Sequence, residues 1–164
     1  MARRAYPLAQ VYGLIEPGPV VLLATAGPRH PNLMTLSWLM PVEFEPALLA
    51  CVLSERDYSH GLLVKNRECV LAIPTVELAG QVVAVGNCSG REVDKFRAFG
   101  LTPVAAAEVA APLVGECWAN LECRVHDTRM VRRYGLFVLE VVKAWVDRAV
   151  KEPKTLHHRG QGAF

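Results

Sequence analysis

The stretch from Asn32 to Pro41 constrains the fold more than any other, because large apolar residues occupy every second position along it. In an extended strand, successive side chains point to opposite faces. One face of such a strand would carry Met34, Leu36, Trp38 and Met40. The other face would carry the hydroxyls of Thr35 and Ser37, and a buried hydroxyl needs a hydrogen-bond partner. The pattern therefore indicates either a ligand-binding edge or a half-buried strand whose two hydroxyls face water.

Further apolar runs predict a mostly antiparallel β protein. Residues 20–26 are apolar except for Thr25 and would form a hairpin with the 32–41 strand across the turn 27–31. Additional strands are expected over residues 48–53, 69–74, 113–125 and 135–146. Short helices are expected over residues 8–15, over 61–66 with Asp57 or Ser59 as the cap, over 76–85, and after the loop that begins at 86. Strands with few parallel crossovers are typical of an antiparallel barrel with helical additions.

Composition predicts one domain that spans residues 1–164. A chain of 164 residues with 52% hydrophobic content can bury about two thirds of the surface that its unfolded state exposes. Eighteen basic and sixteen acidic residues leave a net charge of +2, without the concentrated basic surface that nucleic-acid binding needs. No apolar run approaches the ~20 residues of a membrane-spanning helix. The sequence thus predicts a protein that binds neither nucleic acid nor a membrane.

The five cysteines predict reduced thiols and a cytoplasmic protein. Their number is odd, and they form no close pair with metal-ligand spacing. Four of them lie in apolar or strand-like contexts and are expected in the core, whereas Cys88 lies in a polar loop. A metal shared by His157 and His158 is not expected either, because adjacent residues of an extended chain point in different directions.

Two polar segments predict sites for an anion. Residues 54–60 combine two serines and Arg56 with the start of a helix, whose free backbone amides and dipole favour negative charge. Residues 86–96 form a glycine-bounded loop that offers amides, a hydroxyl and cations. Each segment also has an explanation without a ligand, namely a capped helix with a solvated arginine and an ordinary Ser-Gly turn.

Motifs of several other enzyme classes are missing from the sequence. It contains no Gly-rich dinucleotide fingerprint, no phosphate-binding loop that ends in Gly-Lys-Ser/Thr, no Gly-x-Ser-x-Gly elbow and no His-Glu-x-x-His. Hydrolase and nucleoside-triphosphatase functions are therefore disfavoured.

Three segments, taken in order, resemble the flavin reductase-like family, the FMN-binding split barrels that include flavoredoxins and ferric reductases. The segments are Asn32 to Trp38 with Pro41, Ser54 to His60, and Gly86 to Arg91 with Asp94 to Phe96. Val141 to Asp147 also resembles the family's late strand, so the resemblance covers about residues 18 to 150. It implies a mostly β fold, an antiparallel and Greek-key-like split β-barrel with a few short helices.

The resemblance further implies a homodimer that holds FMN near the dimer interface. The residues that would line the isoalloxazine ring are Met34, Thr35, Leu36, Ser37 and Trp38. The residues that would surround the phosphate are Ser54, Arg56, Tyr58 and Ser59, with Ser89 and Lys95 as a second wall. An arginine and a lysine supply the compensating charge that serines cannot. The resemblance assigns no metal ligand.

The implied function is that of an oxidoreductase. NADH or NADPH would give a hydride to FMN, which would pass electrons to free flavin, a ferric chelate, another small molecule or a partner protein. Because the flavin performs the redox chemistry, the protein needs no catalytic triad, and none is evident in the sequence. A second interpretation is a flavoredoxin-type FMN electron carrier without nicotinamide turnover of its own. A third is a barrel that has lost the flavin and serves as an interaction module, although Arg56 and Lys95 argue against it.

The C-terminal tail and the last turn carry two further observations. In the hypothesis that the tail suggests, His157 and Arg159 would lie at the open side of the flavin and help to admit the nicotinamide or the acceptor; the alternative is a solvated tail. Many flavin reductases carry Gly-Asp-His between the two final strands, whereas this chain has Arg132-Arg133-Tyr134-Gly135 there. That departure disfavours efficient NADH-dependent reduction of free flavin.

Overall fold

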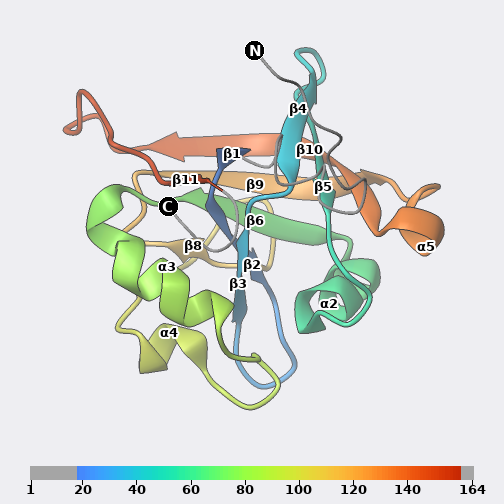
Figure 1. Cartoon of the computed structure of the whole chain (residues 1–164). Helices are drawn as coiled ribbons and strands as arrows, with labels where there is room; N and C mark the ends of the chain where they lie inside the picture. Colours follow the sequence, from blue (N-terminus) through green and yellow to red (C-terminus); the bar gives the residue numbers. More distant parts are fainter. Residues whose placement is uncertain (1–17, 160–164) are drawn as a thin grey trace, which may run out of the picture.

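The structure, a computed structural model, describes residues 18–159 and is built on a seven-stranded antiparallel sheet. Neighbouring strands run in the order β3-β2-β6-β9-β10-β5-β4 (Figure 1). These strands are β2 (Val21–Thr25), β3 (Asn32–Leu36), β4 (Leu39–Glu43), β5 (Leu48–Val52), β6 (Glu68–Ile73), β9 (Ala119–Asp127) and β10 (Leu136–Val146). Two small sheets pair β1 (Gly18–Pro19) with β11 (His157–His158) and β7 (Pro103–Val104) with β8 (Leu113–Val114).

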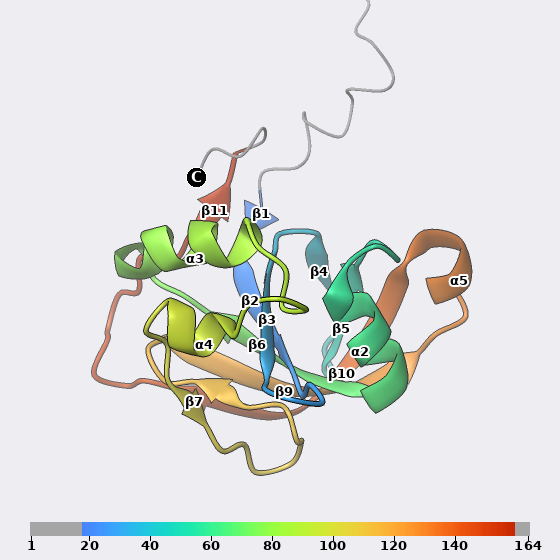
Figure 2. The same ribbon diagram turned by 90° about the horizontal axis from the view of Figure 1, so that it is seen from below.

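The short helices lie in two groups on either side of β2 and β3 (Figures 1 and 2). One group contains α3 (Ala79–Gly86), which follows the 3₁₀ turn η2 (Val76–Leu78), and α4 (Lys95–Ala98). The other contains α2 (Tyr58–Asn66) and α5 (Val131–Tyr134). Strand β3 is in contact with α2, α3 and α4, so helices of both groups reach it, whereas α5 packs against β10.

The two edges of the main sheet are joined by a connection of only two residues, Ser37 and Trp38, between β3 and β4. In a flat sheet, seven strands would hold the edge strands roughly 29 Å apart, since neighbouring strands are ~4.8 Å apart. The three Cα–Cα steps from Leu36 to Leu39 span at most about 11 Å. The sheet must therefore curl until its edges approach, which gives the split barrel that the family resemblance implies.

The prediction that Asn32 to Pro41 form one continuous strand is wrong. The chain leaves β2 after Leu36 and pairs with β5 from Leu39 onward, so the strand is broken at residues 37–38. The strand breaks because the barrel closes here. Closure depends on pairing between distant parts of the chain, which the apolar alternation does not reveal. Within β3 the expected alternation holds, because Leu33 and Leu36 are buried in two different cores.

These two cores lie on the two faces of the sheet. The barrel core gathers apolar side chains from all seven strands, including Leu23, Leu39 and Phe137. The outer core lies between β2, β3 and β6 and the helices α3 and α4, and includes Val82 and Phe96. Four cysteines are buried, Cys88 is half-buried, and all five are free thiols, as the sequence predicts.

Other expected elements are confirmed or corrected by the structure. The hairpin of β2 and β3 and the strands near residues 48–53, 69–74 and 135–146 are present. The single strand over 113–125 is wrong, because a turn closed by the bond from the Cys117 amide to the Val114 carbonyl separates β8 from β9. Helix α2 begins at Tyr58, earlier than expected, and the Asp57 side chain does not cap it. The predicted helix over 8–15 lies outside the described residues.

Gly135 offers a test of how α5 is attached to the barrel. Its φ is +64°, and a Cβ atom there would lie 2.1 Å from the Leu53 carbonyl oxygen. The Gly135→Ala substitution is expected to lower the free energy of unfolding by about 2 kcal/mol or more, because strain and a steric clash add. Urea denaturation measures the change. Gly61→Ala in α2 is the control, since nothing lies within 4 Å of its added Cβ atom; alanine there should stabilise by ~0.5–1 kcal/mol. Equal effects of the two substitutions would contradict this account.

Candidate functional site

A polar hollow of about 470 Å³ lies between β3, the start of α2, the end of α3 and the loop that leads to α4. It brings together seven of the residues proposed from the sequence: Met34, Thr35, Arg56, Tyr58, Ser59, Ser89 and Lys95. Its other lining residues are Asn32, Asp57, Val85, Gly86, Asn87, Cys88 and Gly90. The two polar segments that predict anion sites thus face each other across one hollow.

Polar side chains of β3 hold the walls of this hollow together. The Asn32 side-chain amide donates to the Ser59 hydroxyl at 2.8 Å and to the Thr25 hydroxyl at 3.4 Å. The Thr35 hydroxyl donates to the Val82 carbonyl of α3 at 2.6 Å. Because β3 is an edge strand, its outer side has no neighbouring strand to satisfy its peptide groups. A ligand in the hollow would therefore meet main-chain donors and acceptors as well as side chains.

Asn32 presents an acceptor that no residue between 18 and 159 satisfies. The residue is 1% exposed, and its Oδ1 atom has no hydrogen-bond partner in this part of the chain. Gly90 lies close to it, since a Cβ atom at Gly90 would be 1.8 Å from Asn32 Oδ1. A buried polar group without a partner is costly. Because residue 90 has no side chain, there is space beside it for the Asn32 Oδ1 atom. A ligand hydroxyl in the hollow is a suitable donor for it.

Lys95 supplies a buried cation to the same hollow. It is only 4% exposed, and its ammonium donates to the Val85 carbonyl at 2.8 Å. Burial lowers the pKa of Lys95, while the nearby Cys88 and Asp57 act in the opposite direction. No ion pair within residues 18–159 includes Lys95 or Arg56. An ammonium group has three donors, so two remain for an anion.

The loop before α2 is shaped by its own side chains. The Asp57 carboxylate accepts from the Ser54 amide at 3.0 Å, and the Ser54 hydroxyl accepts from the Arg56 amide at 3.3 Å. These bonds leave the Arg56 side chain exposed at the mouth of the polar hollow. The guanidinium of Arg91 lies 4.9 Å from the centre of the ring of Tyr58, which lines the hollow. Arg56 and Arg91 thus bring positive charge to this side of the hollow, which Asp57 also lines.

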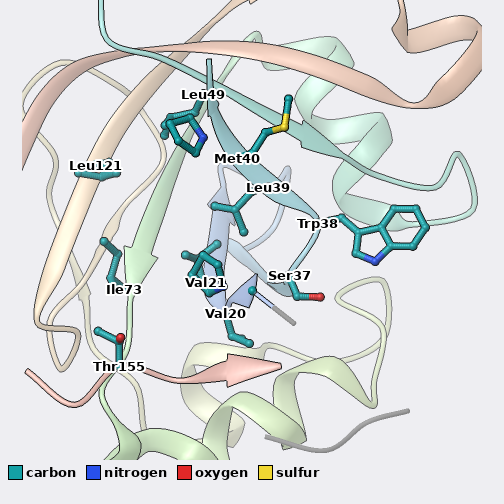
Figure 3. A pocket seen from close by; sticks show the side chains of 13 residues that line it. Val20, Val21, Ser37, Trp38, Leu39, Met40, Leu49, Ile73, Leu121 and Thr155 are labelled. Atoms are coloured by element: carbon teal, nitrogen blue, oxygen red, sulfur yellow. The ribbon is translucent and has the colours of Figure 1, made fainter. Parts of the chain in front are cut away.

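The remaining strand residues proposed from the sequence lie elsewhere. Ser37 and Trp38 line an apolar hollow of about 710 Å³, whose walls include Val21, Leu39, Leu49, Ile73 and Leu121 (Figure 3). Figure 3 shows the indole of Trp38 turned away from these aliphatic side chains. Leu36 is buried in the barrel core and is 4% exposed. The residues from Met34 to Trp38 therefore connect a polar hollow with an apolar one.

Ser54, His157 and Arg159 are not brought into the polar hollow. Ser54 lines a third hollow of about 470 Å³, named here the arginine hollow, together with Trp38, Val52, Leu53, Glu55, Arg132, Arg133, Tyr134 and Gly135. His157 and Arg159 are exposed, in β11 and just after it. β11 pairs with β1, whose two residues line the apolar hollow. The proposed role of His157 and Arg159 stays a prediction.

Two groups of site residues escaped the sequence analysis. Asn32 begins one of the three segments that resemble the family, but an asparagine at the start of a strand does not by itself indicate a buried hydrogen-bond acceptor. Arg132, Arg133 and Tyr134 were noted only as a departure from the family pattern. Their exposed charges, next to one another in a turn, were the available signal.

As a whole, the polar hollow suits a ligand that carries a phosphate and hydroxyl groups next to a flat apolar part. Arg56, Ser89 and Lys95 offer cationic and hydroxyl donors for the phosphate, and Asn32 Oδ1 offers an acceptor for a hydroxyl. The residues that follow in β3 and its connection lead to apolar surface. Within the described part of the chain, no cluster of His, Cys, Asp and Glu could hold a metal ion, and no helix has the length and hydropathy to cross a bilayer.

Comparison with known proteins gives a consistent result. Residues 14–163 match the family model of the flavin reductase like domain. A protein of Archaeoglobus fulgidus that is described as uncharacterized is 36% identical over 132 residues, which cover 80% of this chain and 75% of that protein. Among solved structures, the FMN-binding protein from Thermus thermophilus with bound p-hydroxybenzaldehyde superposes with a TM-score of 0.82 at 25% identity, over 99% of this chain and 92% of that one. Flavoredoxin from Methanosarcina acetivorans has a TM-score of 0.78 at 28% identity, over 90% and 77% of the two chains.

The buried Lys95 predicts a specific dependence of stability on pH. The pKa of Lys95 is lowered in the folded protein from its ordinary value of 10.5. At pH values between the folded-state pKa and 10.5, the unfolded chain therefore binds a proton that the folded protein has lost. The free energy of unfolding of the wild type, relative to Lys95→Met, should therefore rise as pH increases through this window. Urea denaturation from pH 7 to 10.5 measures it. Lys65→Met, at an exposed position of α2, is the control and should leave the profile unchanged. Parallel profiles for the wild type and Lys95→Met would disprove the assignment.

Proposed function

The chain belongs to the flavin reductase-like family, and on that premise we propose that it is an FMN-binding oxidoreductase. In this function NADH or NADPH is the electron donor, and free flavin, a ferric chelate or a partner protein is the acceptor. Bound FMN would supply the redox chemistry, since it accepts a hydride and returns electrons singly or in pairs. The protein would supply binding, orientation and electrostatics.

The observation that carries the proposal is the buried Lys95 ammonium, which forms no ion pair among residues 18–159, in the same polar hollow as Asn32 Oδ1, which has no hydrogen-bond partner among those residues. Lys95, Arg56 and Ser89 would hold the phosphate of FMN, because charge-assisted hydrogen bonds are the strong ones. Asn32 Oδ1 would accept from a ribityl hydroxyl. The segment from Met34 to Trp38 would run beside the isoalloxazine ring. Ser37 lines the apolar hollow, whereas the Leu36 side chain is buried in the barrel core and the Trp38 indole turns away from the aliphatic side chains (Figure 3).

Two alternatives remain as second candidates. Similarity to a flavoredoxin favours an FMN electron carrier that exchanges electrons with other proteins and has negligible nicotinamide turnover. A barrel without flavin, serving as an interaction module, would have no use for the buried cation of Lys95, because burying an uncompensated charge is costly. The flavin-binding functions are therefore preferred over the third.

A homodimer is the second part of the proposal. Its support is an apolar ridge on β4 and the turn after it, which consists of Trp38, Met40, Val42 and Phe44 with exposed fractions of 50, 58, 48 and 96%. The ridge adjoins the apolar hollow, which Trp38 and Met40 also line. A two-fold axis lets the same surface serve both partners, so that a ridge and a hollow on one chain can meet those of a second copy. Apolar surface of this kind marks interaction sites.

The function is tested by the visible spectrum of the purified protein, followed by anaerobic mixing with NADPH and with NADH. The expected results are one FMN per chain and rapid bleaching by at least one of the two nucleotides. Arg56→Ala should weaken FMN binding about ten-fold or more. Arg97→Ala removes an exposed arginine of α4 outside the hollow and should leave FMN binding unchanged. Bound flavin that neither nucleotide bleaches would favour the carrier, and a protein that takes up no FMN would overturn both flavin functions.

Sedimentation velocity tests the dimer. The wild type is expected to sediment as a dimer, and Met40→Glu as a monomer, because a charge buried in an apolar contact without a partner is strongly unfavourable. Val83→Glu is the matched control, since Val83 is 41% exposed on α3, away from the ridge. A wild-type monomer that is fully loaded with FMN would refute the dimer while leaving the flavin function intact.

A further inference from the structure

Cys88 differs from the other four cysteines in its surroundings, and the proposed function gives it no role. It is half-buried and lines the polar hollow, whereas the other four thiols are buried. Burial raises the pKa of Cys51 and that of Cys117 to about 12, which keeps both thiols protonated, and the reactive form of a cysteine is the thiolate. Cys88 is therefore the thiol that a reagent from solvent reaches first.

The loop that follows α3 fixes Cys88 at the wall of the polar hollow. On one side of it, the Asn87 amide donates to the Ala84 carbonyl at 3.2 Å. On the other side, the Ser89 hydroxyl accepts from the Arg91 amide at 3.3 Å. Because both chain neighbours of Cys88 are hydrogen-bonded, the thiol extends from a backbone with little freedom. A fixed position lowers the entropic cost of a reaction at its sulfur.

A buried cation lies near this thiol. The Lys95 ammonium lines the same hollow and forms no ion pair among residues 18–159. Burial lowers the pKa of Lys95, and Cys88 is the largest influence in the opposite direction, which places the two groups close together. Arg56 brings a second cation to the hollow, and Asp57 brings one carboxylate. A cleft with an excess of positive charge attracts anionic reagents and speeds their arrival.

An independent feature indicates that this hollow is built to hold a ligand. The Asn32 Oδ1 atom is buried in its wall and accepts no hydrogen bond from residues 18–159. A ligand that carries a hydroxyl or an N–H group as well as an anionic group would supply the missing donor. The volume of about 470 Å³ falls within the usual range for a small-molecule site. Cys88 thus lies inside a ligand site and not on open surface.

We propose that Cys88 is a thiol–disulfide exchange site for small anionic disulfides, and that the mixed disulfide formed there occupies the flavin seat and excludes FMN. The Cys88 thiolate attacks one sulfur of the disulfide, whose S–S bond breaks as the new S–S bond to Cys88 forms. The proton of Cys88 passes to solvent, and the other half of the reagent leaves as a thiolate. The Cys88 sulfur is oxidised and the leaving sulfur is reduced, so the flavin supplies no electrons.

The mixed disulfide would place its anionic group near Lys95, where the FMN phosphate otherwise binds. Mixed disulfides are reversible, so loading with FMN would depend on whether Cys88 is reduced. The exclusion of FMN rests on the proposed function, whereas the exchange site rests on the charge and geometry of the hollow.

Stopped-flow labelling of the flavin-free protein tests the site with two disulfide probes, the dianionic dithiobis(nitrobenzoate) and the uncharged dithiodipyridine. One thiol per chain is expected to react fast, and Cys88→Ser should remove this fast reaction. The control thiol is introduced by Lys65→Cys in the Cys88→Ser background, at an exposed position outside the hollow. The ratio of the dianionic to the uncharged rate constant should be about ten-fold higher for Cys88 than for the control thiol. This preference should fall as salt concentration rises.

Three further measurements connect the thiol with the cation and with the flavin. Lys95→Met should slow the dianionic probe several-fold and leave the rate with the uncharged probe within about two-fold. Inorganic phosphate should slow the dianionic probe at Cys88 and not at the control thiol. FMN at about ten times its Kd should slow both probes at Cys88 roughly ten-fold, because only about a tenth of the hollows are then empty. Protein that carries the mixed disulfide should take up no FMN until dithiothreitol has restored the thiol.

The possible failures can be told apart. A fast reaction that survives in Cys88→Ser, or an anion preference at Cys88 no greater than that of the control thiol, would overturn the exchange site. Protein with the mixed disulfide that binds FMN as tightly as the reduced protein would overturn the exclusion. FMN binding and bleaching by NADPH or NADH are followed separately in the visible spectrum, and in both cases they would still uphold the proposed function. Conversely, a protein that binds no FMN, but whose Cys88 prefers the dianionic probe, would uphold the exchange site and refute the flavin function.

Discussion

Only two residues, Ser37 and Trp38, join the two edges of the main sheet. This short connection determines where helices and ligands can approach the edge strand β3. It forces the sheet to curl, and it places the end of β3 at the seam of the barrel. At the seam the strand has a neighbour on one side only, so its other side is available to helices and ligands. The polar hollow, the apolar hollow and the arginine hollow all include residues of β3 or of this connection. The three hollows are therefore consequences of one closure.

The side chains of β3 then fix the helices around that seam. Asn32 ties the strand to Ser59 of α2, and Thr35 ties it to the Val82 carbonyl of α3. Among residues 18–159, two groups in the resulting hollow are left without a direct partner of the kind they favour: the Asn32 Oδ1 atom accepts no hydrogen bond, and the Lys95 ammonium forms no ion pair. Buried polar and charged groups that lack partners inside the protein are found chiefly at functional sites. A ligand with a hydroxyl and a phosphate would relieve both groups at once.

Local patterns in the sequence were sufficient for much of this architecture. The continuous apolar run before residue 26 and the alternation after residue 32 predicted the β2–β3 hairpin, because both periods are local properties. The same alternation continues through Trp38 and Met40, and so it could not reveal that the strand breaks at residues 37–38. For the site, serines and cations predicted an anion site in each of two loops, and the family resemblance implied that the two loops meet. The burial of Asn32 and the placement of Ser54 in a different hollow depend on contacts across the fold, which no local pattern carries.

The close approach of Gly90 to Asn32 has a consequence for how this sequence can vary during evolution. Any side chain at position 90 would occupy the space of Asn32 Oδ1, because a Cβ atom there lies 1.8 Å from that oxygen. The two positions, 58 residues apart in the chain, are therefore not free to drift independently. While Asn32 keeps its present bond to Ser59, a larger residue at position 90 requires either that the Asn32 side chain rotate away or that position 32 become smaller. In an alignment of homologues the pair should appear as a covarying couple.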